Sequence, residues 1–274
     1  MERIEIIGDN FKGKYTCSRT ASRVVIIEDD RVLFTSLDND TYMIPGGGLE
    51  LNESIEECAI REAEEETGYI IKLSEPVLEI DEYYDDYLYK SIYFLGRIES
   101  KGTQKLTQVE LNRHLKVEWL KIKDIINTLS KYNECDKEIK RGLFYREYRA
   151  LSHILSERKK YNNKLHSLLG AMIEGVVDRP IGSTHPKHSD MIYPINYGYI
   201  EDFIAPDSEG EDVYILGSLK PIDRFKGKVI AIVERINDFE NKLVVSLDNK
   251  DYSIEEIEEK VNFQEKYYKH RIIK

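Results

Sequence analysis

A glycine-rich loop followed by a strongly acidic segment constrains this 274-residue chain more than any other feature. Pro45 and the three glycines after it break regular structure and open a loop. Ser54, with Glu57 three residues later, forms a capping box that marks the start of a helix. Gly68 is the residue type that ends helices most readily. The sequence therefore predicts a loop, a helix over residues 54–66, and a second loop.

Three carboxylates of this helix, Glu62, Glu65 and Glu66, share one face at about 100° per residue. That face overlaps the apolar stripe, so the acids are expected to point toward the protein. Like charges held close together raise one another's pKa unless a cation lies among them. Carboxylate oxygens of this kind suit Mg²⁺ or Mn²⁺. The alternative for a bare glutamate run is a solvated acidic surface.

The spacing over residues 47–69 resembles the Nudix box, GX5EX7REUXEEXGU, in which U is a bulky apolar residue. Gly47 fits the opening glycine, Glu53 the lone glutamate, residues 61–66 the REUXEE core, and Gly68 the closing glycine. Only residues 63 and 69 fit U loosely. The resemblance implies an α+β protein whose first domain is a Nudix α/β/α sandwich with a mixed sheet.

The same resemblance implies a hydrolase that acts on phosphoanhydride bonds and depends on Mg²⁺, with Mn²⁺ as a second option. In this family the acidic helix holds metal against a diphosphate, so Glu62, Glu65 and Glu66 would be metal ligands. Arg61 would brace these acids, and Glu53 would steady the loop or contact the metal through water. The metals act as Lewis acids and lower the pKa of an attacking water.

The general base is not fixed by the box. Glu118 lies where some family members carry an extra carboxylate, and a surface glutamate at a strand end is an equal alternative. The expected substrate is a nucleotide or dinucleotide joined through a diphosphate, which Gly47 would meet in the loop. Tyr83 and Tyr84 are candidates for stacking on a base, although half-buried sheet residues are the more common meaning of such tyrosines. Arg19 and Arg23 are weaker candidates for phosphate contacts.

A second domain follows the first. Residues 136–161 carry an amphipathic pattern that predicts a long helix, which would complete a first domain over residues 1–161. Beyond residue 163, short β-branched runs alternate with Pro, Gly and Asp clusters, as is typical of a small β-barrel. We therefore expect a barrel domain over residues 164–274, closed by one or two helices over residues 254–268.

The barrel domain resembles the soluble, Mg²⁺-dependent inorganic pyrophosphatases at residues 177–179, 193–200 and 207–213. The resemblance implies a phosphate- and metal-binding site. Its candidate residues are Arg179, Tyr197, Asp207, Glu209, Asp212, Asp238, Glu240 and Lys242. The segment that supplies a lysine and two glutamates in the family is missing, and Glu replaces Asp at positions 209 and 240. An active pyrophosphatase, a degenerate phosphate-binding module and a structural module all stay open. His185 and His188 are expected in a surface loop.

Composition excludes some classes of partner. The net charge of −11 argues against a protein that holds duplex nucleic acid, which needs a basic face. The longest apolar runs are too short to span a membrane. Three widely spaced cysteines are typical of reduced thiols in a cytoplasmic protein. A homo-oligomer is compatible with the sequence, and a non-catalytic nucleotide sensor is the alternative to an enzyme.

Overall fold

The computed structural model describes residues 1–38, 40–185, 191–206 and 209–274, and the chain divides into two units, Met1–Ser156 and Glu157–Lys274. This division falls within a long helix, α4 (Glu138–His166), whereas the sequence placed it between residues 161 and 164. The helix continues beyond its predicted end at residue 161. Lys164 and His166 in its last turn complement the negative end of the helix dipole.

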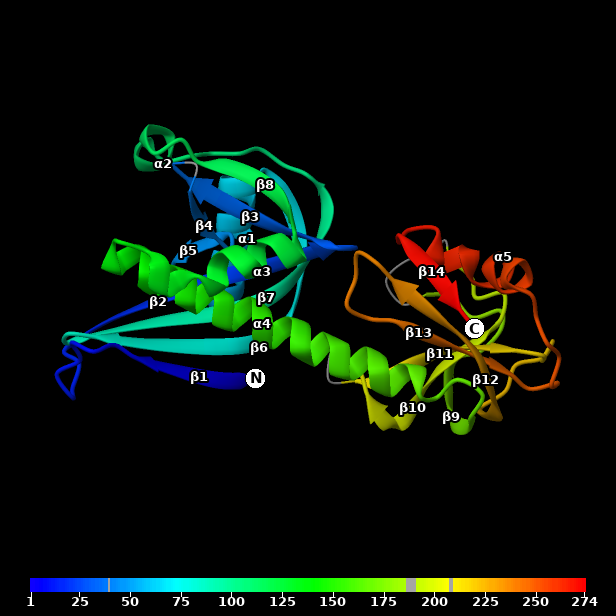
Figure 1. The fold of residues 1–274 in the computed structure, drawn as a ribbon. Coiled ribbons are helices and arrows are strands. Elements are labelled where there is room, and N and C mark those ends of the chain that lie inside the picture. The colour runs from blue at the N-terminus through cyan, green and yellow to red at the C-terminus, as the bar shows by residue number, and fades with distance from the viewer. Residues whose placement is uncertain (39, 186–190, 207–208) are drawn as a thin grey trace. The chain divides into compact units, whose positions relative to one another are not determined.

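An eight-stranded mixed sheet forms the centre of the first unit (Figure 1). The strand order is β1-β6-β7-β2-β3-β4, with β5 paired to β2 and β8 paired to β3. The pairs β1–β6 and β2–β7 are parallel, and the others are antiparallel. The strands are β1 (Glu2–Ile7), β2 (Cys17–Glu28), β3 (Arg31–Leu37), β4 (Thr41–Met43), β5 (Gly46–Gly48), β6 (Tyr69–Tyr84), β7 (Tyr87–Lys101) and β8 (Lys116–Lys121).

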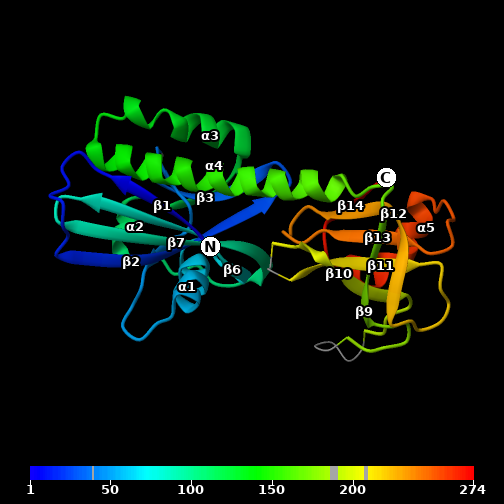
Figure 2. The same cartoon turned by 90° about the horizontal axis from the view of Figure 1, so that it is seen from below.

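Helices cover both faces of this sheet. Helix α1 (Ile55–Thr67) lies on one face, and α3 (Ile122–Ser130) and the first part of α4 lie on the other (Figure 2). Two short elements, α2 (Gln108–Asn112) and the 3₁₀ turn η1 (Tyr132–Glu134), lie in the connections. The expected α/β/α sandwich with a mixed sheet is confirmed.

The core beneath α1 explains why small residues stand in the acidic helix. Ala59 and Ala63 are fully buried there, in one cluster with Val24, Leu33 and Phe94. Because alanine adds little bulk, the helix axis can approach the sheet closely. This close packing brings Glu62 and Glu66 of the helix against the neighbouring strand β5.

Two features of the sheet differ from the sequence prediction. The glycine run was expected as a loop, but Gly46–Gly48 pair with β2 as a short strand. A Cβ on Gly46 would overlap the backbone of Ser22, so only glycine allows this approach. The sequence also predicts strands over residues 78–82 and 89–97, and β6 and β7 extend well beyond both runs. Strand β6 continues through Pro76 by means of register shifts on both sides of it.

The second unit is a closed five-stranded barrel, as the sequence predicted. Its strand order is β13-β11-β10-β9-β12, and β12 pairs with β13 to close the ring. A sixth strand, β14, was not expected and extends the sheet from β12. The elements are β9 (Met172–Arg179), β10 (Asn196–Ile204), β11 (Gly210–Leu216), β12 (Arg224–Arg235), β13 (Lys242–Ser246), α5 (Ile254–Glu265) and β14 (His270–Ile273).

Apolar side chains fill the barrel and the space beneath α5. One cluster includes Val213, Ile215 and Val229, and a second includes Tyr214 and Ile257. The alternation along β11 explains this division, because successive residues of a strand point to opposite faces. Helix α5 ends at Glu265, three residues before the predicted end.

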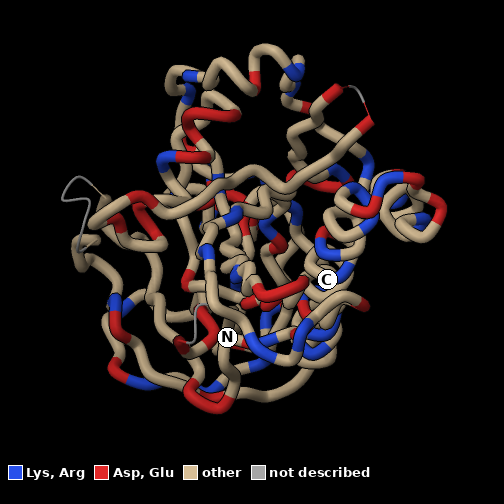
Figure 3. The backbone as a smooth tube through the Cα atoms, turned by 90° about the vertical axis from the view of Figure 1, so that its left-hand side faces the viewer, with Lys and Arg blue, Asp and Glu red and all other residues tan. Residues whose placement is uncertain are grey.

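The structure shows where the charged residues and the cysteines lie. Acidic and basic positions are interspersed along the chain (Figure 3). All three cysteines are free. Within the described ranges, no helix is both long and apolar enough to cross a membrane.

Candidate active site

Local signals fix the position of helix α1. The Ser54 hydroxyl accepts a hydrogen bond from the Glu57 amide at 3.1 Å, and the Glu57 carboxylate accepts one from the Ser54 amide at 2.9 Å. At the other end Gly68 adopts a left-handed conformation, with φ of 72°. Both predicted caps are confirmed. They determine which way each glutamate of the helix points.

Arg61 is the centre of the acidic cluster. Its Nε and Nη2 donate to the two carboxylate oxygens of Glu53 at 2.6 and 2.9 Å. Its Nη1 lies 2.8 Å from Glu62 and 3.2 Å from Glu65. The hydrogen bonds from Arg61 lower the pKa of Glu53 to about 2, so this carboxylate is charged at neutral pH. Arg61 thus links Glu53 to two of the three acids, and its role in catalysis stays a prediction.

Glu66 and Glu62 lie against the glycine strand. Glu66 is 5% exposed, and its carboxylate accepts a hydrogen bond from the Gly46 amide at 3.0 Å. Burial raises the pKa of Glu66 to about 8, and the charge of Glu62 adds to this effect. Burial also raises the pKa of Glu62. A Cβ on Gly47 would overlap the Glu62 carboxylate, which explains why glycine is needed there.

These acids fit a divalent cation by their chemistry. Burial and mutual repulsion disfavour their charged forms, and a bound cation removes both penalties. Oxygen donors of this kind suit Mg²⁺ or Mn²⁺. Among the described residues no three acids already form a ligand set, and the Arg61 guanidinium occupies the space between Glu62 and Glu65. A metal there would compete with Arg61 for these two carboxylates.

A further carboxylate, Glu110, was missed by the sequence analysis. The loop before α2 is tied to the end of α1, because Gln104 donates to the Glu66 carbonyl at 2.6 Å and the Lys105 amide to the Glu65 carbonyl at 2.8 Å. Burial is the largest cause of the raised pKa of Glu62 and of Glu66, and the charge of Glu110 is a smaller cause. The capping box of Thr107 and Glu110 is a sequence signal for α2, but not for its position near the site.

The predicted residue Glu118 lies on β8, where its carboxylate accepts a hydrogen bond from the Ser36 hydroxyl of β3. Ser36 is fully buried. This contact gives Glu118 a structural partner, and its catalytic role stays a prediction.

Tyr83 and Tyr84 do not form a joint clamp for a base. They are neighbours in β6, so their side chains leave opposite faces of the sheet. The Tyr83 ring packs against Phe11, with centroids 5.2 Å apart. The Tyr84 hydroxyl lies beneath α4, 3.1 Å from where a Cβ on Gly142 would stand. Burial raises the pKa of Tyr84 to about 12.

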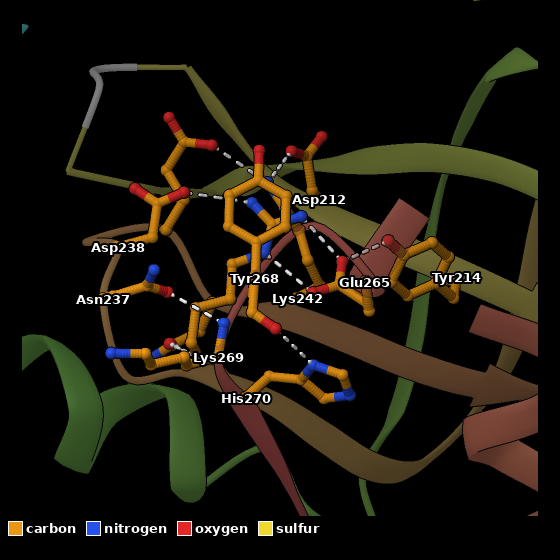
Figure 4. Close-up of polar contacts among 12 residues, drawn as sticks. Asp212, Tyr214, Asn237, Asp238, Lys242, Glu265, Tyr268, Lys269 and His270 are labelled. Carbon is orange, nitrogen blue, oxygen red and sulfur yellow. Dashed lines mark hydrogen bonds and ion pairs between the residues drawn. The ribbon is translucent and has the colours of Figure 1, made fainter. Parts of the chain in front are cut away.

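Three predicted residues of the second unit come together around a fourth, Lys242. Figure 4 shows Lys242 beside one of them, Asp212. The Lys242 ammonium is buried and forms ion pairs with Asp212 and, at 3.1 Å, with Glu240. Buried Tyr197 hydrogen-bonds to Asp212. Burial alone would lower the pKa of Lys242, but the charge of Asp212 outweighs it and the pKa is raised. Lys242 is therefore an internal counter-ion for both acids.

A second buried cation, Arg235, lies nearby and was not predicted. It is 1% exposed, and its Nε and Nη2 donate to Glu265 at 2.9 and 2.6 Å. The predicted residue Asp238 pairs with Arg235 at 3.3 Å, and the Tyr268 ring covers the guanidinium, with its centroid 3.5 Å away. In the sequence, Arg235 was marked by its position at the end of a β-branched run, which does not indicate that the side chain is buried.

The other candidates of the second unit are more dispersed. Arg179, at the end of β9, pairs with its neighbour Asp178 at 2.8 Å. Glu209 lies just before β11 and has interaction partners of its own. Asp207 and His188 lie outside the described residues. Across the part of the barrel that is described, no three acids form a metal ligand set.

Comparison with known protein families gives a match within the first unit. The family model described as NUDIX domain matches residues 18–143. Similar solved structures include a NUDIX hydrolase from Nitrosomonas europaea, with 21% identity over 48% of this chain and 89% of that chain, at a TM-score of 0.37. An ADP-ribose pyrophosphatase from Streptococcus suis shows 15% identity over 39% and 75% of the two chains, at a TM-score of 0.31. The match to a Nudix domain therefore lies within the first unit and includes the acidic helix and the glycine strand.

Proposed function

We propose that the first unit hydrolyses a nucleoside diphosphate-linked substrate in a reaction that depends on Mg²⁺. The observation that supports this most directly is the contact of the acidic helix with the glycine strand. Glu66 accepts from the Gly46 amide, Glu62 lies on Gly47, and Arg61 joins Glu62 and Glu65 to Glu53. All the polar residues of the box are present and held in one cluster.

In this proposal Glu62, Glu65 and Glu66 would hold Mg²⁺ or Mn²⁺. The bound metal would neutralise the diphosphate and lower the pKa of the attacking water. The water oxygen forms a bond to phosphorus as the bridging P–O bond breaks, and a carboxylate takes the water's proton. Glu110 is favoured as this base because the loop before α2 is bound to the end of α1, and Glu118 is the alternative; each carboxylate also has a structural partner, Thr107 for Glu110 and Ser36 for Glu118.

A substrate screen with matched variants tests the proposal. Nucleoside triphosphates, nucleoside diphosphate sugars and dinucleoside polyphosphates are incubated with Mg²⁺ or Mn²⁺, and phosphate and pyrophosphate are measured. Glu65→Gln and Glu66→Gln should lower kcat by at least about 10²-fold. Glu56→Gln, an exposed change in the first turn of α1, is the control and should leave kcat unchanged. Unchanged turnover in Glu65→Gln and Glu66→Gln would remove these acids from the mechanism, and tight binding without turnover would identify a nucleotide sensor instead.

We infer that the second unit is a degenerate, pyrophosphatase-like barrel that does not turn over pyrophosphate. The pairing of Asp212 and Glu240 with Lys242, and of Asp238 with Arg235, supports this inference, because internal cations already neutralise these acids. The full chain carrying Glu65→Gln should release no phosphate from pyrophosphate with Mg²⁺. Release that disappears on adding Asp212→Asn would show an active second site.

A further inference from the structure

A small surface beside the glycine strand has no role in the proposed chemistry. It consists of Arg19 on β2 and of Tyr87 and Tyr89 on β7, and we refer to it as the Tyr89 surface. In the parallel β2–β7 pair Arg19 is opposite Tyr89, and Cys17 is opposite Tyr87. Residues two apart in a strand share a face, so these three side chains lie on one side of the sheet.

The two tyrosines of this surface form an exposed stack. Their ring centroids are 4.8 Å apart and their planes differ by 21°. Tyr89 is 39% exposed, so part of its ring is open to solvent. An open aromatic ring can stack on a planar base, and each such stack contributes about 1–3 kcal/mol in other systems.

Arg19 supplies a cation without a counter-ion. Among the described residues it forms no hydrogen bond or ion pair, although the chain carries a net charge of −11. By contrast, Arg3, Arg23, Arg61 and Arg146 each pair with a carboxylate. An exposed arginine that stays unpaired in an acidic chain is available to an anionic ligand.

The Arg19 guanidinium also lies at the glycine strand. A Cβ on Gly48 would stand 2.7 Å from its Nη2 and 2.8 Å from its Nε, so glycine at this position makes room for it. The next glycine, Gly47, is in contact with Glu62. Because Gly47 and Gly48 are consecutive, Glu62 and Arg19 meet this three-residue strand on opposite faces, and a ligand that contacts both would pass around the strand.

The spacing of the sheet gives the length of a ligand that would join these groups. Gly48 is opposite Ala21, which is two residues along β2 from Arg19, and Tyr89 is one strand further across. With strands about 4.8 Å apart and a rise of about 3.3 Å per residue, Gly48 and Tyr89 are about 12 Å apart. Arg19 lies between them.

We propose that the Tyr89 surface recognises the nucleoside of the substrate, with the base stacked on Tyr89 and the phosphate nearest the ribose bound by Arg19. This inference rests on the proposed function and makes it more specific, since it requires an aromatic base next to the diphosphate. Stacking accepts any base, so the surface selects nucleoside diphosphates over pyrophosphate rather than one base over another. Tyr83 and Tyr84 are not part of this surface. The Tyr83 side chain lies on the opposite face of the sheet, against Phe11, and Tyr84 lies under α4.

Binding measurements without turnover test the proposal. The full chain is titrated by calorimetry with ADP, UDP and pyrophosphate in EDTA. Tyr89→Ala should weaken the binding of ADP and UDP by about 5- to 150-fold and leave that of pyrophosphate unchanged. Arg19→Gln should weaken all three. Tyr89→Phe keeps the ring and should bind as the wild type does, which separates loss of stacking from loss of fold.

Tyr15→Ala is the matched control, because Tyr15 is 50% exposed and packs against Tyr83. It should leave all three affinities unchanged. Equal affinity of the wild type for ADP, UDP and pyrophosphate would overturn the proposal, as would an equal loss for all three in Tyr89→Ala. Failure of the proposed hydrolysis is seen separately, as unchanged turnover in Glu65→Gln, since no turnover enters the titrations.

Discussion

Arg61 holds Glu53 by a two-pronged ion pair, with Nε to Oε1 at 2.6 Å and Nη2 to Oε2 at 2.9 Å. The same guanidinium reaches Glu62 at 2.8 Å. One side chain therefore joins the loop before α1 to the acids of the helix. The planar fork of arginine makes this geometry, and the ammonium of lysine does not reproduce it.

Arg61→Lys should therefore lower both activity and stability. The charge is kept, but the fork is lost, so the acids of the cluster are no longer held in place. We expect kcat to fall by at least about 10-fold and the free energy of unfolding by about 1–2 kcal/mol, a modest figure because Arg61 is 24% exposed. Kinetics at saturating Mg²⁺ and chemical denaturation measure the two effects. Arg113→Lys, in an exposed pair with Asp38, is the control, and a kcat within twofold of wild type in Arg61→Lys would contradict the bracing role.

A comparison of Glu110→Gln with Glu118→Gln tests which carboxylate assists the reaction. Loss of a general base costs about 10²- to 10⁴-fold in kcat. We expect this loss for Glu110→Gln, because the loop before α2 is bound to the end of α1, and a change of less than about threefold for Glu118→Gln. Glutamine can still accept the hydrogen bonds from Thr107 and Ser36 that the two carboxylates accept, so both variants keep these contacts. Initial rates with Mg²⁺ measure both. The reverse order would assign the base to Glu118.

The acidic helix was predictable because its signals are local. Ser54 and Gly68 set its ends within the segment itself, and the caps then fix the direction of Glu62, Glu65 and Glu66. The family resemblance added the roles of these acids. The positions of Tyr83 and Tyr84 were also predictable, because successive side chains of a strand point to opposite faces. This rule alone places the two rings on opposite faces of the sheet.

The rest of the site depends on contacts that are distant in sequence. Glu110 approaches the helix because the loop before it is bound to the α1 carbonyls, and no pattern in the sequence records that binding. The pairing of the glycine run with β2 depends in the same way on the backbone of Ser22. In the barrel, Arg235 and Glu265 are 30 positions apart, so their pairing follows only from the closed fold.

Glu265→Gln tests the weight of that buried pair. Removing the charge takes away the partner that Arg235 contacts through two nitrogens and leaves the pair with Asp238 at 3.3 Å. Breaking a buried pair costs about 3–5 kcal/mol in comparable sites. Hydrogen exchange of β12 and α5 in the full chain reads out the barrel alone. Glu201→Gln, in an exposed pair with Arg224 at 4.0 Å, should have almost no effect. Equal protection in the two variants would show that Arg235 finds another partner.

His270 should make the stability of the barrel depend on pH. Its Nε2 lies 3.0 Å from the Glu258 carboxylate of α5, and its Nδ1 lies 3.1 Å from the Tyr268 carbonyl. Burial lowers the pKa of His270, but these two contacts outweigh it and raise the pKa above 6.5. The folded state therefore favours the protonated ring, so this stabilisation is fully present below about pH 6.5 and is lost as the pH rises through the folded pKa.

Hydrogen exchange of α5 and β14 should show less protection, relative to His270→Gln, as the pH passes upward through this range. His114→Gln, an exposed change in the first unit, should keep the wild-type profile, and a constant difference between the wild type and His270→Gln at every pH would contradict the prediction.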